Sequence, residues 1–144
     1  MLLNRDRPYD RSNQVQRRDD YDSGRPHDVH FQRQRLVALT QMTYVGAPMI
    51  YYGDEVGMWG ADDPTNRKPM LWRDLEPYAN PEQNFIMEDH HAFYREAVGL
   101  RRAHAALRVG AFRTLVADDE QDLWGFERRH GDELMLVALN AGSE

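Results

Sequence analysis

Two adjacent acidic residues, Asp54 and Glu55, stand directly after a short apolar run at residues 47–52 and could serve acid–base chemistry or bind polar groups. The run lies between two glycines and is typical of a strand buried on both faces of a parallel sheet. Ligands of parallel α/β folds bind where the carboxyl ends of such strands meet. The two acids could equally cap the next turn or pair with arginine, and spacing alone does not decide.

A loop of about 28 residues, 53–80, follows the run and holds a second candidate pair, Asp63 and Arg67. Loops longer than roughly 12 to 15 residues in compact domains are usually functional or disordered. Trp59 and Trp72 favour an ordered binding loop, since tryptophan is costly to leave in a disordered segment. The four-residue spacing of the pair around a proline is also typical of a short helical turn with an N-terminal cap and an ion pair. On spacing alone that structural interpretation is the stronger one.

The histidines give weaker signals. His27 and His30, or His90 and His91, could suggest a metal, but no third ligand stands at a recognisable spacing. We therefore expect solvated or capping histidines, no metal site and no cofactor. His104 falls on an apolar helical stripe, and we expect a hydrogen-bonded core residue there.

Two helices are predicted on either side of this loop. The first begins near Asp28, is apolar on most of its circumference and ends at Gly46, which suits a helix covered on two sides. The second runs from residue 84 to 107 and ends at Gly110, because apolar residues recur there at helical spacing. A helix followed by a buried strand predicts an α/β fold.

The period changes after the second helix. Short runs of β type at residues 112–116, 123–128 and 134–140 predict antiparallel strands, and the turn at 130–132 joins the last two as a hairpin. The acidic run at 118–122 is predicted to be a solvated turn. Three strands do not close a sandwich.

Composition excludes several classes of protein. The 144 residues include 24 acidic and 18 basic side chains and no cysteine, which removes disulfides, thiolate nucleophiles and cysteine-based zinc sites. An acidic net charge of −6 disfavours a nucleic-acid partner. Apolar runs are far shorter than the roughly 20 residues needed to span a bilayer, so we expect no membrane partner. The first residues carry no secretory signal, and we expect a cytoplasmic location.

Three motifs together carry a resemblance to a known family. The run GAPMIYYGDE at residues 46–55 resembles the eighth-strand motif of the alpha-amylase family of glycoside hydrolases, glycoside hydrolase family 13. The loop WGADDPTNRKPMLW at residues 59–72 resembles that of the cyclomaltodextrinase, neopullulanase and maltogenic amylase branch. Residues 100–110 resemble the last helix of the family's barrel, with Ala105 where the family usually has proline.

The resemblance implies an α/β fold: the C-terminal part of a (β/α)8 TIM barrel in residues 1–110, followed by the beginning of an antiparallel β-sandwich domain in residues 111–144. It also implies a retaining mechanism on α-glucans, in which one carboxylate forms a glycosyl-enzyme intermediate and another acts as acid and then as base. The family's three acidic active-site residues follow the fourth, fifth and seventh strands, and none has a counterpart in this sequence. We therefore expect a fragment without catalytic residues that is inactive alone.

Carried over residue by residue, Asp63 and Arg67 match the family's loop pair that hydrogen-bonds a glucose unit on the non-reducing side of the cleavage point. The resemblance therefore favours sugar binding by these two residues over a short helical turn with an ion pair. Trp59 is expected to form part of the cleft wall, and Asp54 and Glu55 match a motif that is partly structural. The expected ligand is an α-glucan or maltooligosaccharide, and full-length family members are often dimeric.

Two other interpretations remain open at this point. The chain could be a non-catalytic module that binds glucan or complements a barrel formed by another chain. It could also be part of a related transglycosylase, such as a trehalose synthase-like enzyme.

Overall fold

The computed structural model describes residues 24–60 and 66–142. In chain order these contain helix α1 (Asp28–Thr43), the 3-10 turns η2 (Asp54–Val56) and η3 (Arg73–Leu75), helices α2 (Glu88–Ala103) and α3 (Ala105–Val109), and strands β1 (Ala111–Asp118), β2 (Leu123–His130) and β3 (Glu133–Asn140). No helix among the described residues is long and apolar enough to cross a membrane.

Contacts divide the chain into two compact units. The loop unit comprises residues 24–31 and the described part of 50–91 and contains η2 and η3. The sheet unit comprises residues 32–49 and 92–142 and contains most of both long helices, α3 and the strands.

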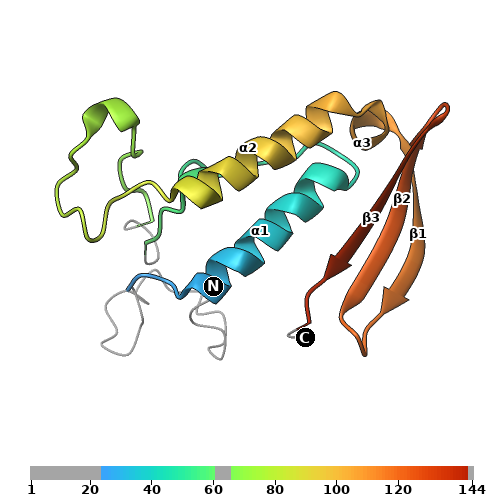
Figure 1. Cartoon of the computed structure of the whole chain (residues 1–144), viewed down its shortest axis with the longest axis horizontal. Helices are drawn as coiled ribbons and strands as arrows, with labels where there is room; N and C mark the ends of the chain where they lie inside the picture. Colours follow the sequence, from blue (N-terminus) through green and yellow to red (C-terminus); the bar gives the residue numbers. More distant parts are fainter. Residues whose placement is uncertain (1–23, 61–65, 143–144) are drawn as a thin grey trace. The chain divides into compact units, whose positions relative to one another are not determined.

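The strands form an antiparallel meander in the order β1-β2-β3, visible in Figure 1. The β2–β3 register pairs His130 with Glu133, so the hairpin turns at Gly131 and Asp132, as the sequence predicted. Gly131 has a φ of 58°, which glycine adopts at little cost. At the other turn, the Asp118 carboxylate accepts the backbone N–H groups of Glu120 and Gln121, which confirms the predicted exposed turn.

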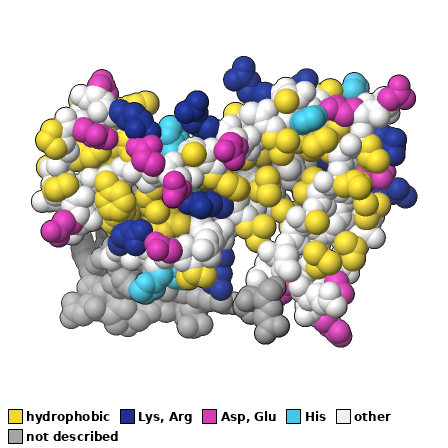
Figure 2. All heavy atoms as spheres, viewed as in Figure 1, with side chains coloured by type: hydrophobic (Ala, Val, Ile, Leu, Met, Phe, Trp, Pro, Cys, Tyr) yellow, Lys and Arg dark blue, Asp and Glu magenta, His cyan; other side chains and the backbone are white. Residues whose placement is uncertain are grey.

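One face of the sheet carries the core of the sheet unit. Phe126 is fully buried, and its ring centroid lies 5.1 Å from that of Phe112 and 4.8 Å from that of Trp124. Tyr44, just after α1, completes this aromatic cluster at 5.1 Å from Phe112. Leu115, Leu134 and Leu136 are exposed, and Figure 2 shows apolar side chains at the surface over the strands.

Two buried arginines hold the end of α1. Arg101 of α2 donates to the carbonyl oxygens of Met42, Tyr44 and Gly46 at 2.8, 3.0 and 2.5 Å. Arg128 of β2 donates to those of Thr43 and Gly110 at 2.7 and 2.9 Å. The last carbonyls of a helix lack partners within it and carry partial negative charge. The two guanidinium groups therefore supply hydrogen-bond donors to the C-terminal end of α1 and the residues just after it.

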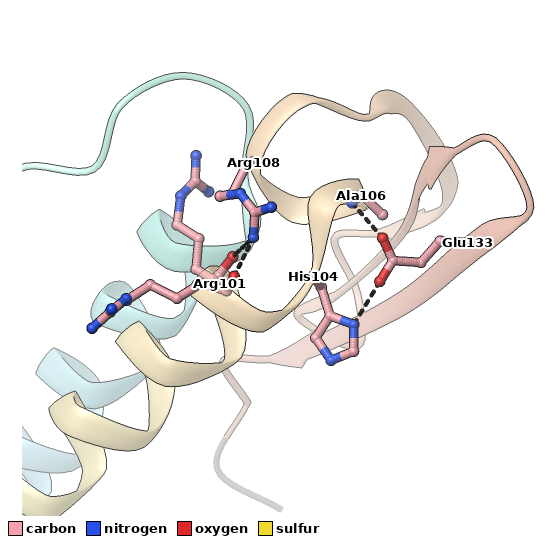
Figure 3. A network of polar contacts seen from close by, with 6 residues as sticks. Arg101, His104, Ala106, Arg108 and Glu133 are labelled. Atoms are coloured by element: carbon pink, nitrogen blue, oxygen red, sulfur yellow. Dashed lines mark hydrogen bonds and ion pairs between the residues drawn. The ribbon is translucent and has the colours of Figure 1, made fainter.

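The second predicted helix is interrupted. It begins at Glu88, four residues after the predicted start, and breaks at His104, which is extended with φ −109° and ψ 115°. The Glu133 carboxylate accepts the backbone N–H of Ala106 at 2.8 Å and lies 2.7 Å from His104 Nδ1, as Figure 3 shows. A residue of β3 thus caps α3. The apolar spacing of residues 84–107, from which the helix was predicted, carries no information about a carboxylate in a later strand.

The predicted buried strand at residues 47–52 is wrong for this structure. No strand forms there among the described residues, and the side chains of Met49, Ile50, Tyr51 and Tyr52 are all exposed. A strand is stabilised by hydrogen bonds to neighbouring strands, and the described chain offers this segment none. The prediction that α1 is covered on two sides is also wrong, because Val29 and Val37 are exposed.

Candidate functional site

The loop unit contains the described residues of the predicted site: Asp54, Glu55, Trp59 and Arg67. Asp63 lies outside the described residues, and so does the middle of the short helical turn considered for Asp63 and Arg67. The site is therefore built from the η2 turn and from the two ends of the loop that contains Asp63.

The η2 turn places the two acids in different roles. Gly53, with φ 91°, begins the turn, and its N–H donates to Glu55 Oε2 at 2.9 Å. The Glu55 carboxylate is thus used within the turn, which agrees with the capping interpretation for this residue. Partial burial raises the pKa of Asp54, and the neighbouring Glu55 charge adds to the rise.

The backbone of η2 is held by a buried histidine. His90 is fully buried, its Nε2 lies 3.1 Å from the Asp54 carbonyl oxygen, and its ring packs edge-on against Phe31 at 5.7 Å. This contact gives the histidine at the start of α2 a structural role. Among the described residues, no group of three histidine or acidic side chains is placed to hold a metal ion.

Trp59 is half-buried and held on two sides. Its ring lies 5.7 Å from that of Phe85 at an interplanar angle of 67°, and the Lys68 ammonium lies 5.4 Å from its centroid. The second contact is a cation–π interaction. It joins residues on either side of the segment that contains Asp63. Sequence reasoning missed Lys68, although it is the chain's only lysine.

Tyr52 ties the same part of the loop to the start of η2. Its hydroxyl donates to the Lys68 carbonyl oxygen at 2.9 Å, across 16 residues. Its ring contacts that of Tyr51 at 4.9 Å. Partial removal from water raises the pKa of Tyr52, while the positive charge of Arg67 opposes that rise. Arg67 is exposed and is electrostatically coupled to this tyrosine.

Three further residues, His104, Trp72 and Arg73, make other contacts. His104 is half-exposed instead of in the core, and it is hydrogen-bonded to Glu133. Trp72 is 59 % exposed, and its carbonyl oxygen accepts the Tyr78 hydroxyl at 2.8 Å. The Arg73 guanidinium forms a bidentate ion pair with Glu88. The described part of the loop is therefore held by several separate side-chain contacts in addition to the buried Val56 and Leu71.

These motifs and the comparisons with known proteins define a class. The chain is a homologue of the cyclomaltodextrinases, neopullulanases and maltogenic amylases of the alpha-amylase family, glycoside hydrolase family 13. No family model matches the chain.

Individual relatives make this assignment specific. The chain is 43 % identical to neopullulanase 2 of Thermoactinomyces vulgaris over 110 residues, which cover 76 % of this chain and 17 % of that protein. It is 39 % identical to a cyclomaltodextrinase of Bacillus sp, over 75 % of this chain and 18 % of the relative. A solved cyclomaltodextrinase structure matches 78 % of this chain and 18 % of its own with a TM-score of 0.66 and 38 % identity. The chain thus spans less than a fifth of the length of these relatives.

Proposed function

We propose that this chain supplies a sugar-binding loop to an α-glucan hydrolase that follows the retaining mechanism. The observation that carries the proposal is the arrangement around Arg67. This exposed arginine matches the family's glucose-binding position, and the next residue, Lys68, is tied to both Tyr52 and Trp59. A guanidinium group donates two parallel hydrogen bonds and suits neighbouring hydroxyls of a sugar.

Asp63 and Trp59 complete the proposed site. A carboxylate accepts hydrogen bonds from sugar hydroxyls, and the indole ring offers a flat apolar surface to the C–H side of a pyranose. Asp63 belongs to the proposal on its motif alone. Asp54 and Glu55 would support the loop from the η2 turn, since one oxygen of Glu55 already accepts the Gly53 N–H.

The same proposal predicts no hydrolysis by the chain itself. The retaining mechanism needs a carboxylate nucleophile and a second carboxylic acid, and the sequence has no counterpart of either family residue. Binding groups alone do not supply a nucleophile. The relevant measurement is reducing-sugar release from cyclomaltodextrin, starch and pullulan. Release that rises in proportion to the amount of protein would refute this part of the proposal.

Binding tests the site directly. We expect the chain to bind maltoheptaose in titration calorimetry, and Arg67→Ala to weaken binding about ten- to a hundredfold, because a lost hydrogen bond from a charged group costs about 1.5–3 kcal/mol. Arg95→Ala is the matched control, since Arg95 is an exposed arginine on α2 outside the loop. Equal affinity in all three proteins would refute the assignment of Arg67.

One observation favours a second candidate, a chain that completes a barrel formed by another chain. Met49, Ile50, Tyr51 and Tyr52 are 36–75 % exposed, and no strand pairs with this segment among the described residues. Adding a strand to an open sheet edge would satisfy its backbone and bury these side chains. Sedimentation of the chain with a homologous barrel that lacks its last strand separates this candidate from the first.

A further inference from the structure

The loop unit contains a linked series of contacts that runs from Tyr52 through Lys68 to Trp59. Tyr52 donates its hydroxyl to the Lys68 carbonyl oxygen at 2.9 Å, which fixes the backbone of that residue. The Lys68 side chain then places its ammonium 5.4 Å from the centre of the Trp59 ring. Neither interaction is needed to form a helix or a strand, because all three residues lie in loops.

Trp59 is also held by a second aromatic residue. Phe85 meets its ring at 5.7 Å and 67°, and the Arg25 guanidinium lies 6.0 Å from the centre of the Phe85 ring. An indole in contact with both an ammonium group and a phenyl ring loses rotational freedom before any ligand arrives. A side chain ordered in advance binds more tightly, since less conformational entropy is lost on binding.

Arg67 shares in the same restraint through its position in the chain. It immediately precedes Lys68, whose carbonyl oxygen is hydrogen-bonded, and its charge acts on Tyr52. Fixing the backbone of Lys68 therefore also restricts the position of the Arg67 backbone, from which the Arg67 side chain extends. The Tyr52 hydroxyl therefore restrains, through Lys68, the stretch of backbone that carries Arg67.

We propose that Tyr52 and Lys68 are positioning residues that hold Trp59 and Arg67 in the geometry that binds an α-glucan. The inference rests on the proposed function, because it assigns the two residues to that same site. Tyr52 and Lys68 act through Trp59 and Arg67 and need not touch the sugar themselves.

The chain's only lysine provides a direct probe. Reductive ¹³C-methylation of the 144-residue chain keeps the charge of Lys68 and adds one lysine signal beside that of the terminal amine, whose lower pKa of about 8 distinguishes it. We expect the ring current of Trp59 to shift the Lys68 methyl signal. Trp59→Leu should abolish that shift, and Tyr52→Phe should move the signal toward its random-coil position.

Maltoheptaose affinity supplies the functional measurement. Tyr52→Phe removes one hydroxyl, and Lys68→Met removes the ammonium but keeps a similar side-chain length. We expect each to raise the dissociation constant about three- to tenfold while the far-UV circular dichroism and the melting temperature stay unchanged. Lys68→Arg preserves a cation over the ring and should restore most of the affinity, whereas a purely structural role for the ammonium predicts no such rescue.

The two proposals fail in different ways. If the parent chain binds maltoheptaose and both variants bind it equally well, the positioning role is overturned and the proposed function stands. If the parent chain does not bind at all, the proposed function fails and the positioning role fails with it. A Lys68 methyl signal that is indifferent to Trp59→Leu also overturns the positioning role, whatever the affinities are.

Discussion

The loop unit and the sheet unit differ in the contacts that stabilise them. The sheet unit buries Phe126, Leu107 and Arg128 almost completely, and its β2–β3 ladder is continuous while the β1–β2 ladder has one irregularity between Thr114 and Val116. The loop unit has two 3-10 turns. It buries a few side chains, among them Phe31, Val56 and His90, and is also held by contacts of exposed groups such as Arg73 and Tyr52. We expect the stability of the first unit to depend mainly on its buried side chains, and the exposed contacts of the second unit to contribute less to stability.

The largest effect should come from the aromatic cluster of the sheet unit. Phe126→Ala removes a fully buried ring and should cost about 3–5 kcal/mol, because a cavity remains where the ring was. Urea unfolding followed by near-ultraviolet circular dichroism measures the loss. Phe85→Ala in the loop unit is the comparison, and its ring is only half-buried. A loss as large for Phe85 as for Phe126 would contradict the contrast between the units.

The next effect should come from the cap on α1. Arg101→Met removes the donor to three carbonyl oxygens and should cost about 1–3 kcal/mol, the range for leaving buried acceptors without partners. Arg102→Met is the matched control on the next position of α2, where the side chain is exposed. The same unfolding experiment applies. Equal stability of the two variants would show that water replaces the guanidinium.

A smaller effect should depend on pH. The Ala106 N–H, and secondly His104, lower the pKa of Glu133 in the folded chain. A lowered pKa means that the stabilisation is present above the unfolded value of about 4.3 and is lost as the pH falls through the folded value. Glu133→Gln should therefore lower the melting temperature at pH 7, and the difference from the parent should vanish in acid.

The control for this experiment is Glu120→Gln, because Glu120 lies in the exposed turn between β1 and β2. Its melting temperature should follow that of the parent throughout the titration. A difference between Glu133→Gln and the parent that persists unchanged as the pH falls into the acid range would show that the carboxylate charge is not what caps α3.

The smallest effect should come from the ion pair of the loop unit. The side chains of Arg73 and Glu88 are 57 % and 61 % exposed, and exposed pairs contribute little because water and salt screen them. Arg73→Ala should leave the melting temperature within experimental error at low and at physiological salt. A loss comparable to that of Arg101→Met would place Arg73 among the structural arginines and weaken the distinction between the units.

The sequence predicted what depends on local pattern. The three strands, their hairpin at Gly131 and the exposed acidic turn follow from alternation and turn residues, and the structure confirms them. The segment at 47–52 has the apolar character of a buried strand, but a strand also needs partners, and composition does not supply them. The break at His104 depends on a carboxylate 29 residues away, which helical spacing does not record.

For the candidate site, the motif drew attention to Trp59 and Arg67 but not to the residues that hold them. The Tyr52 hydroxyl donates to the carbonyl oxygen of Lys68, 16 residues away. Because every residue has a backbone carbonyl, the sequence does not indicate which one accepts this hydrogen bond. Their signal in the sequence was slight: a lone lysine in a chain otherwise rich in arginine, placed next to the predicted binding residue.

The contact between Arg128 and Thr43 spans 85 residues, whereas the β2–β3 hairpin closes through a two-residue turn. Closing a long loop costs more chain entropy than closing a short one, and contacts between distant residues slow folding. We therefore expect the meander to assemble first and α1 to dock onto it late. On this order of events the Arg128 guanidinium stays hydrated until the end of α1 packs against the sheet. The last step of folding in this unit is then also the step that removes that charge from solvent.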